Sequence, residues 1–106
     1  MTVAQFNPAK TRPLSEILSQ EIDGLKRKNI EKLLEISSTT CWRYLTCLSK
    51  QQPKGFDFIA GNQYFSRGSI EALYQFKQLV DMFQYEGAVP RIVNHMERFY
   101  GIQESR

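Results

Sequence analysis

The chain has 106 residues, of which 42% are hydrophobic and 24% charged; this is enough for one core and argues against a disordered chain. No apolar run approaches the roughly 20 residues of a membrane helix, and the first residues lack a signal-peptide pattern, so we expect a cytoplasmic protein. The net charge is +3 and it is unevenly distributed: residues 1–54 hold nine basic and five acidic side chains, whereas residues 55–106 hold five basic and six acidic ones. This excess of positive charge in the first half favours a polyanionic partner.

The first 25 residues are predicted to form a loose arm followed by an amphipathic helix. Four apolar residues recur at helical spacing between Pro13 and Gly24, namely Leu14, Ile17, Leu18 and Ile22. Gly24 suits the end of this helix. An isolated amphipathic helix needs a surface on which to bury its apolar stripe, so the segment is our first candidate for homodimer formation.

A helix-turn-helix is predicted after the basic cluster Lys26, Arg27 and Lys28. A short helix ends near residue 35 or 36, and Ser37 is the expected N-cap of a second helix over residues 38–50, because its hydroxyl can accept from a backbone N–H. At about 100° per residue, this second helix has two faces. The apolar face holds Cys41, Tyr44, Leu45 and Leu48, and the opposite face holds Thr39, Arg43, Thr46 and Lys50 without any acidic residue.

Residues 56–65 are predicted to form a β-hairpin. Phe56 and Phe58 alternate with Asp57, and the pair Gly61-Asn62 between two β-prone runs is typical of a two-residue turn. Strands this short are not stable alone, so the hairpin must pack on the helices. A hairpin directly after a helix-turn-helix is a wing.

Two further helices are expected at the carboxyl end. Ser66 is the predicted N-cap of a third helix that ends at Gly87, and Pro90 suits the first turn of a last helix that ends before Gly101. The apolar surface of residues 74–85 is expected to be ordinary core, with burial against a second copy as the alternative. That second candidate for dimer formation consists of Tyr74, Leu79, Met82 and Phe83.

The motif ISSTTCWRYL resembles the V-S-x-S-T-V-Y-R-W-L signature of excisionase-like and MerR-type DNA-binding domains. GNQYFSRGSIEAL resembles their wing and third helix, and YEGAVPRIVNHM is similar to the fourth helix of the MerR type. The resemblance covers about residues 28–100. It implies a mainly α fold with a small β-hairpin wing, which is a winged helix-turn-helix domain over residues 26–106, here preceded by the extra amino-terminal helix of residues 1–25.

The chain departs from this family pattern at two places. Glu35 stands where the family usually has a small residue, and Arg67-Gly68 stand where an acidic pair usually opens the third helix. The dimerising helix and effector-binding domain of full MerR regulators have no counterpart here, so we expect no small-molecule effector.

We therefore expect a sequence-specific, double-stranded DNA-binding transcriptional regulator that acts as a repressor and a homodimer. The helix over residues 38–50 would enter a major groove, the hairpin would contact the backbone or the minor groove, and basic residues would supply sequence-independent affinity. The candidate DNA-binding residues are Lys26, Arg27, Lys28, Ser38, Thr39, Thr40, Trp42, Arg43, Thr46, Lys50, Lys54, Asn62, Gln63 and Arg67.

Two other functions stay open at this point. One is an accessory role in recombination or excision with the same DNA-binding module, and the other is a protein–protein interaction module that binds no nucleic acid. An enzyme is not expected, because the single histidine, His95, has no nucleophile at a defined spacing and the glycines form no phosphate loop. Cys41 and Cys47 form no CxxC pair, so no zinc site is expected. The glycines form no dinucleotide fingerprint either, and no cofactor is expected. Trp42 fits a core position, a base-stacking position or a dimer contact equally well.

Overall fold

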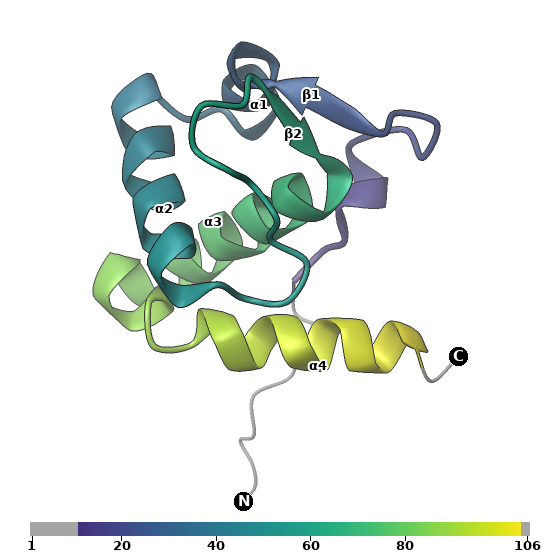
Figure 1. Cartoon of the computed structure of the whole chain (residues 1–106). Helices are drawn as coiled ribbons and strands as arrows, with labels where there is room; N and C mark the ends of the chain where they lie inside the picture. The colour runs from purple at the N-terminus through teal and green to yellow at the C-terminus, as the bar shows by residue number, and fades with distance from the viewer. Residues whose placement is uncertain (1–10, 105–106) are drawn as a thin grey trace, which may run out of the picture.

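Four α-helices and one two-stranded sheet make up residues 11–104, the part of the chain that the computed structural model describes (Figure 1). In chain order the elements are η2 (Leu14–Glu16), β1 (Gly24–Lys26), α1 (Arg27–Leu34), α2 (Ser38–Gln51), β2 (Tyr64–Ser66), α3 (Arg67–Ala88) and α4 (Ile92–Glu104). None of the helices in this described part is long and apolar enough to cross a membrane.

The predicted turn between the first two helices is confirmed. α1 ends at Leu34, and its C-cap residue Glu35 adopts the left-handed conformation (φ 57°, ψ 48°) while its N–H bonds the carbonyls of Glu31 and Lys32. Glycine reaches this conformation at lower cost than glutamate, which accounts for the small residue that the family resemblance leads one to expect here. Two residues later the Ser37 hydroxyl accepts from the Thr40 N–H at 3.0 Å and so caps α2.

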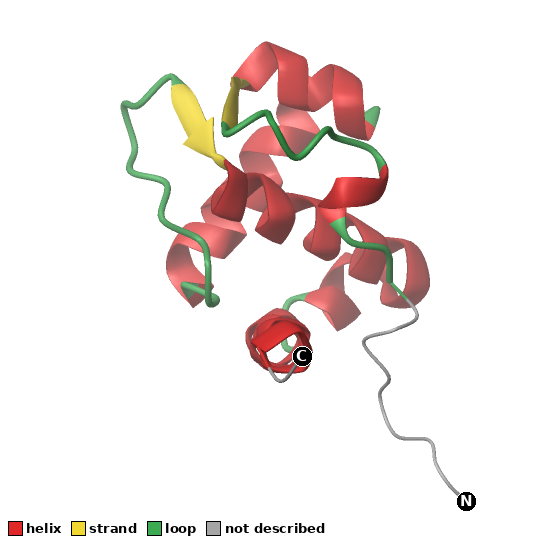
Figure 2. Ribbon diagram, turned by 90° about the vertical axis from the view of Figure 1, so that its right-hand side faces the viewer, coloured by secondary structure: helices red, strands yellow, loops and turns green. Residues whose placement is uncertain are grey.

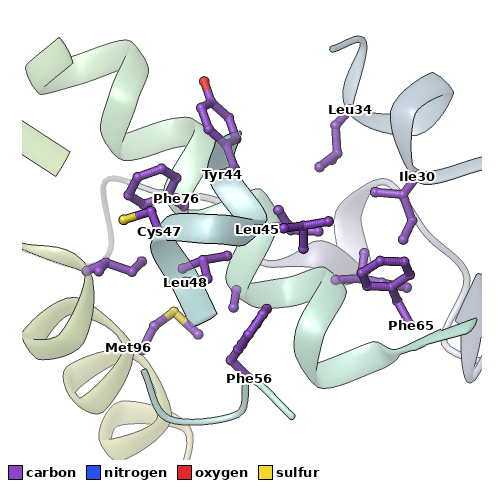
Figure 3. Packing of buried hydrophobic residues seen from close by; sticks show 14 of the residues in the cluster. Ile30, Leu34, Tyr44, Leu45, Cys47, Leu48, Phe56, Phe65, Phe76 and Met96 are labelled. Carbon is purple, nitrogen blue, oxygen red and sulfur yellow. The ribbon is translucent and has the colours of Figure 1, made fainter. Parts of the chain in front are cut away.

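The core is built around α3, which packs against each of the other described elements. α2 contributes the predicted apolar face, since Cys41, Tyr44, Leu45 and Leu48 are all buried. Figure 3 shows Leu45 and Leu48 in the same interior as Phe76 of α3. α4 closes the core at the end of the molecule opposite the sheet, as the views in Figures 1 and 2 both show.

The predicted hairpin is wrong in its pairing. β2 pairs antiparallel with β1, which precedes α1, and Leu25 lies opposite Phe65. Residues 52–63 form a loop instead of the first hairpin strand. The alternation of Phe56 and Phe58 has another cause: Phe56 is buried, and the Phe58 ring stacks on Phe65 with centroids 4.2 Å apart, so both rings anchor the loop to the core.

Gly24 explains why the ladder forms at β1. A Cβ atom at this position would lie 2.5 Å from the Phe65 carbonyl oxygen, so the strands could not approach each other with any larger residue. The Gly61-Asn62 pair still makes a turn, with Gly61 at φ 99° and the Asn62 N–H bonded to the Ile59 carbonyl at 3.1 Å. This turn lies within the loop and joins no two paired strands.

The predicted amino-terminal helix is also wrong, because only the 3-10 turn η2 is helical between residues 11 and 23. The Arg67 guanidinium occupies the carbonyls that an α-helix would need, donating to Leu18 at 3.0 Å and to Ser19 and Ile22 at 2.8 Å each. Leu14 and Leu18 are buried in the chain's own core. Ile17 is 37% exposed and Ile22 is half-buried, so the apolar stripe proposed for homodimer formation is divided between the chain's own core and its surface.

The carboxyl-terminal helices differ from the prediction at their ends. The N-cap at Ser66 is confirmed, since its hydroxyl accepts from the Ser69 N–H. α3 does not end at Gly87 but breaks at Gln84 (φ 68°, ψ 169°) and resumes to Ala88. Only glycine readily enters this region, so the break costs on the order of 1–3 kcal/mol. α4 continues through Gly101 to Glu104, where an end before Gly101 was predicted.

The buried side chain of His95 forms a polar contact between α4 and α3. His95 Nε2 is 2.8 Å from the Gln75 side-chain oxygen, and the Gln75 amide nitrogen donates to the Arg12 carbonyl at 2.7 Å. Because Gln75 uses its nitrogen elsewhere, His95 Nε2 carries the proton and donates. Burial lowers the pKa of His95 from 6.5 to about 4, so the imidazole is neutral in the folded protein at neutral pH.

We predict that protonation of His95 in the unfolded chain destabilises the fold in mild acid. The folded-state pKa lies below the unfolded value, so this contribution to stability is complete above pH 6.5 and is lost as the pH falls towards about 4. Between these values the slope approaches about 1.4 kcal/mol per pH unit. The measurement is thermal unfolding from pH 7.5 to 4.5 for the wild type and for His95→Gln, whose stability should depend less on pH.

A second buried group, Glu71, also contributes to the pH dependence of stability. Burial raises the pKa of its carboxyl, but Glu71 is present in both proteins and cancels in the difference. Parallel curves for the two proteins would contradict the role given to His95.

Candidate nucleic-acid interface

The outward face of α2 carries the side chains that the helical period predicted there. Thr39, Arg43 and Lys50 are exposed, and Thr46 is half-buried with its hydroxyl donating to the Trp42 carbonyl at 2.9 Å. Trp42 is 58% exposed, which excludes the core position left open for it. Polar and cationic groups therefore project from one side of α2, with one large aromatic ring among them.

Three shallow depressions join this face to its neighbours, and together they define what we call the α2–loop surface. The first, about 500 Å³, lies between α2 and the loop and is lined by Arg27, Trp42, Leu45, Thr46, Ser49, Lys50, Phe58, Ala60 and Gly61. The second, about 430 Å³, is lined by Ser38, Thr39, Trp42, Arg43, Thr46 and Tyr85. The third, about 400 Å³, is lined by Lys26, Arg27, Lys28, Phe58, Gly61, Asn62, Gln63 and Phe65.

These depressions form one continuous surface, because neighbouring ones share lining residues. The first and second share Trp42 and Thr46, and the first and third share Arg27, Phe58 and Gly61. Figure 1 shows how the fold produces this arrangement: the loop between α2 and β2 passes in front of α3 and ends at β2, beside β1 and α1. The β1–β2 ladder thus places the loop next to the start of α1.

The charge of the α2–loop surface is positive. Lys26, Lys28, Arg43 and Lys50 are exposed, and none of the described residues that line the three depressions is acidic. Arg27 is the exception among the cations, because its Nε lies 3.0 Å from Glu31 Oε2 and its Nη2 donates to the Ser38 carbonyl at 2.8 Å. Arg27 therefore joins α1 to the start of α2 and is partly neutralised.

Arg43 has a partner that the sequence did not reveal. Its guanidinium carbon lies 3.9 Å from the centroid of the Tyr85 ring, within cation–π distance. Tyr85 belongs to the segment after the break at Gln84, and burial is the largest cause of its raised pKa. No periodicity or cap predicts a break at a glutamine, so nothing in the sequence placed Tyr85 beside α2.

Most of the predicted DNA-binding residues lie together on the α2–loop surface. They are Lys26, Arg27, Lys28, Ser38, Thr39, Trp42, Arg43, Thr46, Lys50, Asn62 and Gln63. Lys54 is exposed in the loop but lines none of the three depressions. Thr40 is part of the cap of α2, since its N–H and hydroxyl both bond the Ser37 hydroxyl. Arg67 is bonded to three backbone carbonyls of the amino-terminal segment, so we assign it a structural role.

Two exposed apolar residues were missed by the sequence reasoning. Ile59 of the loop is 67% exposed, and Tyr64 of β2, which lies opposite Lys26 in the ladder, is 61% exposed. Both were assigned to hairpin strands by their β propensity, and that assignment gave no information on whether they faced the core.

The chemistry that this surface offers is hydrogen bonding, stacking and charge. Its hydroxyl, amide, indole and cationic groups are the kinds that contact phosphate oxygens and base edges. The two free thiols, Cys41 and Cys47, are buried elsewhere in the core, and burial raises the pKa of each, so neither is an activated thiolate. Among residues 11–104 no group of three or more His, Cys, Asp or Glu side chains could hold a metal ion.

Comparisons of the chain with protein-family models, with curated proteins and with solved structures found no match. The resemblance of the helix-turn-helix segment to a DNA-binding family therefore stays a prediction, and any functional proposal depends on the geometry of the α2–loop surface.

We predict that Arg67 stabilises the fold and that the neighbouring surface cations do not. Arg67→Gln removes three charge-assisted hydrogen bonds and should lower the free energy of unfolding by about 2–3 kcal/mol. Lys28→Gln removes one positive charge at an exposed position, and its free energy of unfolding should stay within about 0.5 kcal/mol of the wild-type value. Urea denaturation of the three proteins measures both effects, and equal small changes would return Arg67 to the candidate DNA contacts.

Proposed function

We propose that this protein is a sequence-specific, double-stranded DNA-binding regulator that inserts α2 into a major groove. The observation that carries the proposal is the continuity of the α2–loop surface. It places the polar face of α2 between cations from β1, α1 and α2, and no acidic residue among the described ones lines it. Such a surface attracts the phosphate backbone while it presents hydrogen-bonding groups to the bases.

The outward face of α2 suits base readout. An α-helix with side chains is about 10–12 Å wide, which matches a major groove of about 12 Å. Ser38 and Thr39 are small residues in the first turn, so the start of α2 can approach the DNA closely. Arg43 and Thr46 follow one and two turns later on the same side, where a guanidinium can bond guanine O6 and N7 together.

The flanks of the surface suit backbone contacts. Lys26 and Lys28 project beside Asn62 and Gln63 of the loop, and all four line the same depression. In this proposal the loop takes the place of the predicted hairpin wing, held against α1 by the β1–β2 ladder. Lys50 in the last turn of α2 supplies a cation at the opposite end of the helix.

We further propose that two copies act together as a repressor. One winged module buries only about 600–1,000 Å² on DNA, which limits discrimination among genomic sites, and two copies on half-sites about one helical turn apart would overcome this limit. A bound pair can block a promoter without any further domain. The second candidate set for dimer formation is only partly accessible, because Leu79 is fully buried, Tyr74 and Phe83 are half-buried, and Met82 is 41% exposed.

We predict that DNA affinity falls steeply with salt. If each bound copy neutralises four to six phosphates, log K should fall against log salt with a slope of about −4 to −5. Titration of duplex DNA by fluorescence anisotropy across a salt series measures this slope, and the stoichiometry of the same titration distinguishes one copy per duplex from two. A flat salt dependence, or no binding at low salt, would favour the protein-interaction module.

We predict that Arg43→Ala lowers specific affinity much more than stability. Loss of a bidentate guanine contact costs about 1–3 kcal/mol of discrimination, whereas loss of the Tyr85 contact at an exposed site costs about 0.5–1 kcal/mol of folding free energy. Arg12→Ala is the matched control, because Arg12 is an exposed arginine outside the α2–loop surface. Equal losses of affinity in both variants would show that Arg43 contributes only charge.

A further inference from the structure

The break in α3 is fixed by its surroundings. At Gly87 a Cβ atom would lie 2.7 Å from Phe83 Cβ, so the segment after the break folds back closely on the helix before it. Arg91 lies with its guanidinium carbon 4.1 Å from the Phe83 ring centroid and donates to the Gly87 carbonyl at 2.9 Å. Ala88 is fully buried. These contacts hold Gln84 in its unfavourable conformation and so determine where Tyr85 lies.

Tyr85 is held in place by aromatic contacts as well. Its ring stacks on Tyr44 of α2 with centroids 6.4 Å apart, and it meets Phe76 of α3 edge-on with centroids 5.9 Å apart at 90°. Tyr44 and Phe76 are themselves buried. The ring that Arg43 contacts is therefore fixed by the core, although it borders the exposed surface.

A fixed ring changes what Arg43 can do. A free arginine side chain samples many rotamers, and ordering it on DNA costs affinity. Contact of the guanidinium with an aromatic face restricts those rotamers, and the guanidinium's five N–H donors form a rigid fork that suits bidentate contacts. An arginine held in this way is prepared for bidentate contact before DNA arrives.

We propose that Tyr85 is a positioning residue that orders Arg43 for base discrimination, an inference that rests on the proposed DNA-binding function. The break at Gln84 then contributes to recognition, because it places the Tyr85 ring of α3 beside Arg43 on the outward face of α2. The surface that discriminates among bases includes a residue from outside the helix-turn-helix, and its effect is exerted entirely through Arg43.

The test compares Tyr85→Leu with Tyr85→Phe. A preferred site is first obtained by selection from a random duplex library with the wild-type protein, and its affinity is compared with that for a scrambled duplex of the same composition. Tyr85→Leu should reduce the ratio of these affinities about 3- to 10-fold while the affinity for the scrambled duplex and its salt slope stay unchanged. Tyr85→Phe keeps the ring and should retain the wild-type ratio. In an Arg43→Ala background, Tyr85→Leu should have no further effect.

A second measurement needs no DNA and keeps the proposal testable if Tyr85→Leu does not fold. The Arg43 side-chain Nε–Hε resonance of the free wild-type protein should be shifted upfield by the ring current of Tyr85, and Tyr85→Phe should preserve the shift. An unshifted resonance in the wild type would overturn the positioning role, as would an unchanged affinity ratio in Tyr85→Leu.

The two levels of the proposal fail separately. If the wild type selects no site and binds no duplex at low salt, the DNA-binding function fails, whatever the Arg43 resonance shows. If the wild type discriminates between duplexes and Tyr85→Leu discriminates equally well, the function stands and the role of Tyr85 fails.

Discussion

The short ladder between β1 and β2 is the constraint on which the rest of the structure depends. It joins residues 24–26, which precede α1, to residues 64–66, which follow the loop. The pairing brings Lys26 and Lys28 beside Asn62 and Gln63, and it leads directly into α1 on one strand and α3 on the other. Without it, the cations of α1 and the polar residues of the loop would belong to separate parts of the molecule. Gly24 permits the ladder, because only a residue without a side chain allows the strands to meet at this point.

The features that the sequence predicted correctly are local ones. The cap at Ser37 needs only a hydroxyl three residues from an N–H, and the two faces of α2 follow from a period that is fixed by backbone geometry. The same is true of the cap at Ser66. For this reason most of the candidate site residues, which lie on or next to α1 and α2, could be proposed from the sequence alone.

The features that the sequence did not predict depend on contacts between distant segments. β1 is three residues long and has no alternation of its own, so only its partner 40 residues away makes it a strand. Arg67 is among the residues predicted to contact DNA, but its guanidinium donates to three backbone carbonyls that an amino-terminal α-helix would have used for its own hydrogen bonds. Other polar side chains of α3 also hydrogen-bond the backbone of the amino-terminal segment. Glu71, Gln75 and Gln78 recur at helical spacing and bond the backbone of Arg12 and Leu14, where a solvated face would be the usual interpretation.

The strand pairing also has a consequence for the order of folding. Residues 27–63, which contain α1, α2 and the loop, form a chain segment whose two ends are joined by the hydrogen bonds of the β1–β2 ladder. Bringing the two ends of this segment together costs conformational entropy, whereas the hydrogen bonds of a helix are local and need no such closure. α1 and α2 can therefore acquire helical structure before the ends meet. The α2–loop surface is complete only after closure. Local opening of the ladder would therefore separate the basic flank from α2, and the α2–loop surface would be lost while α1 and α2 still pack on α3.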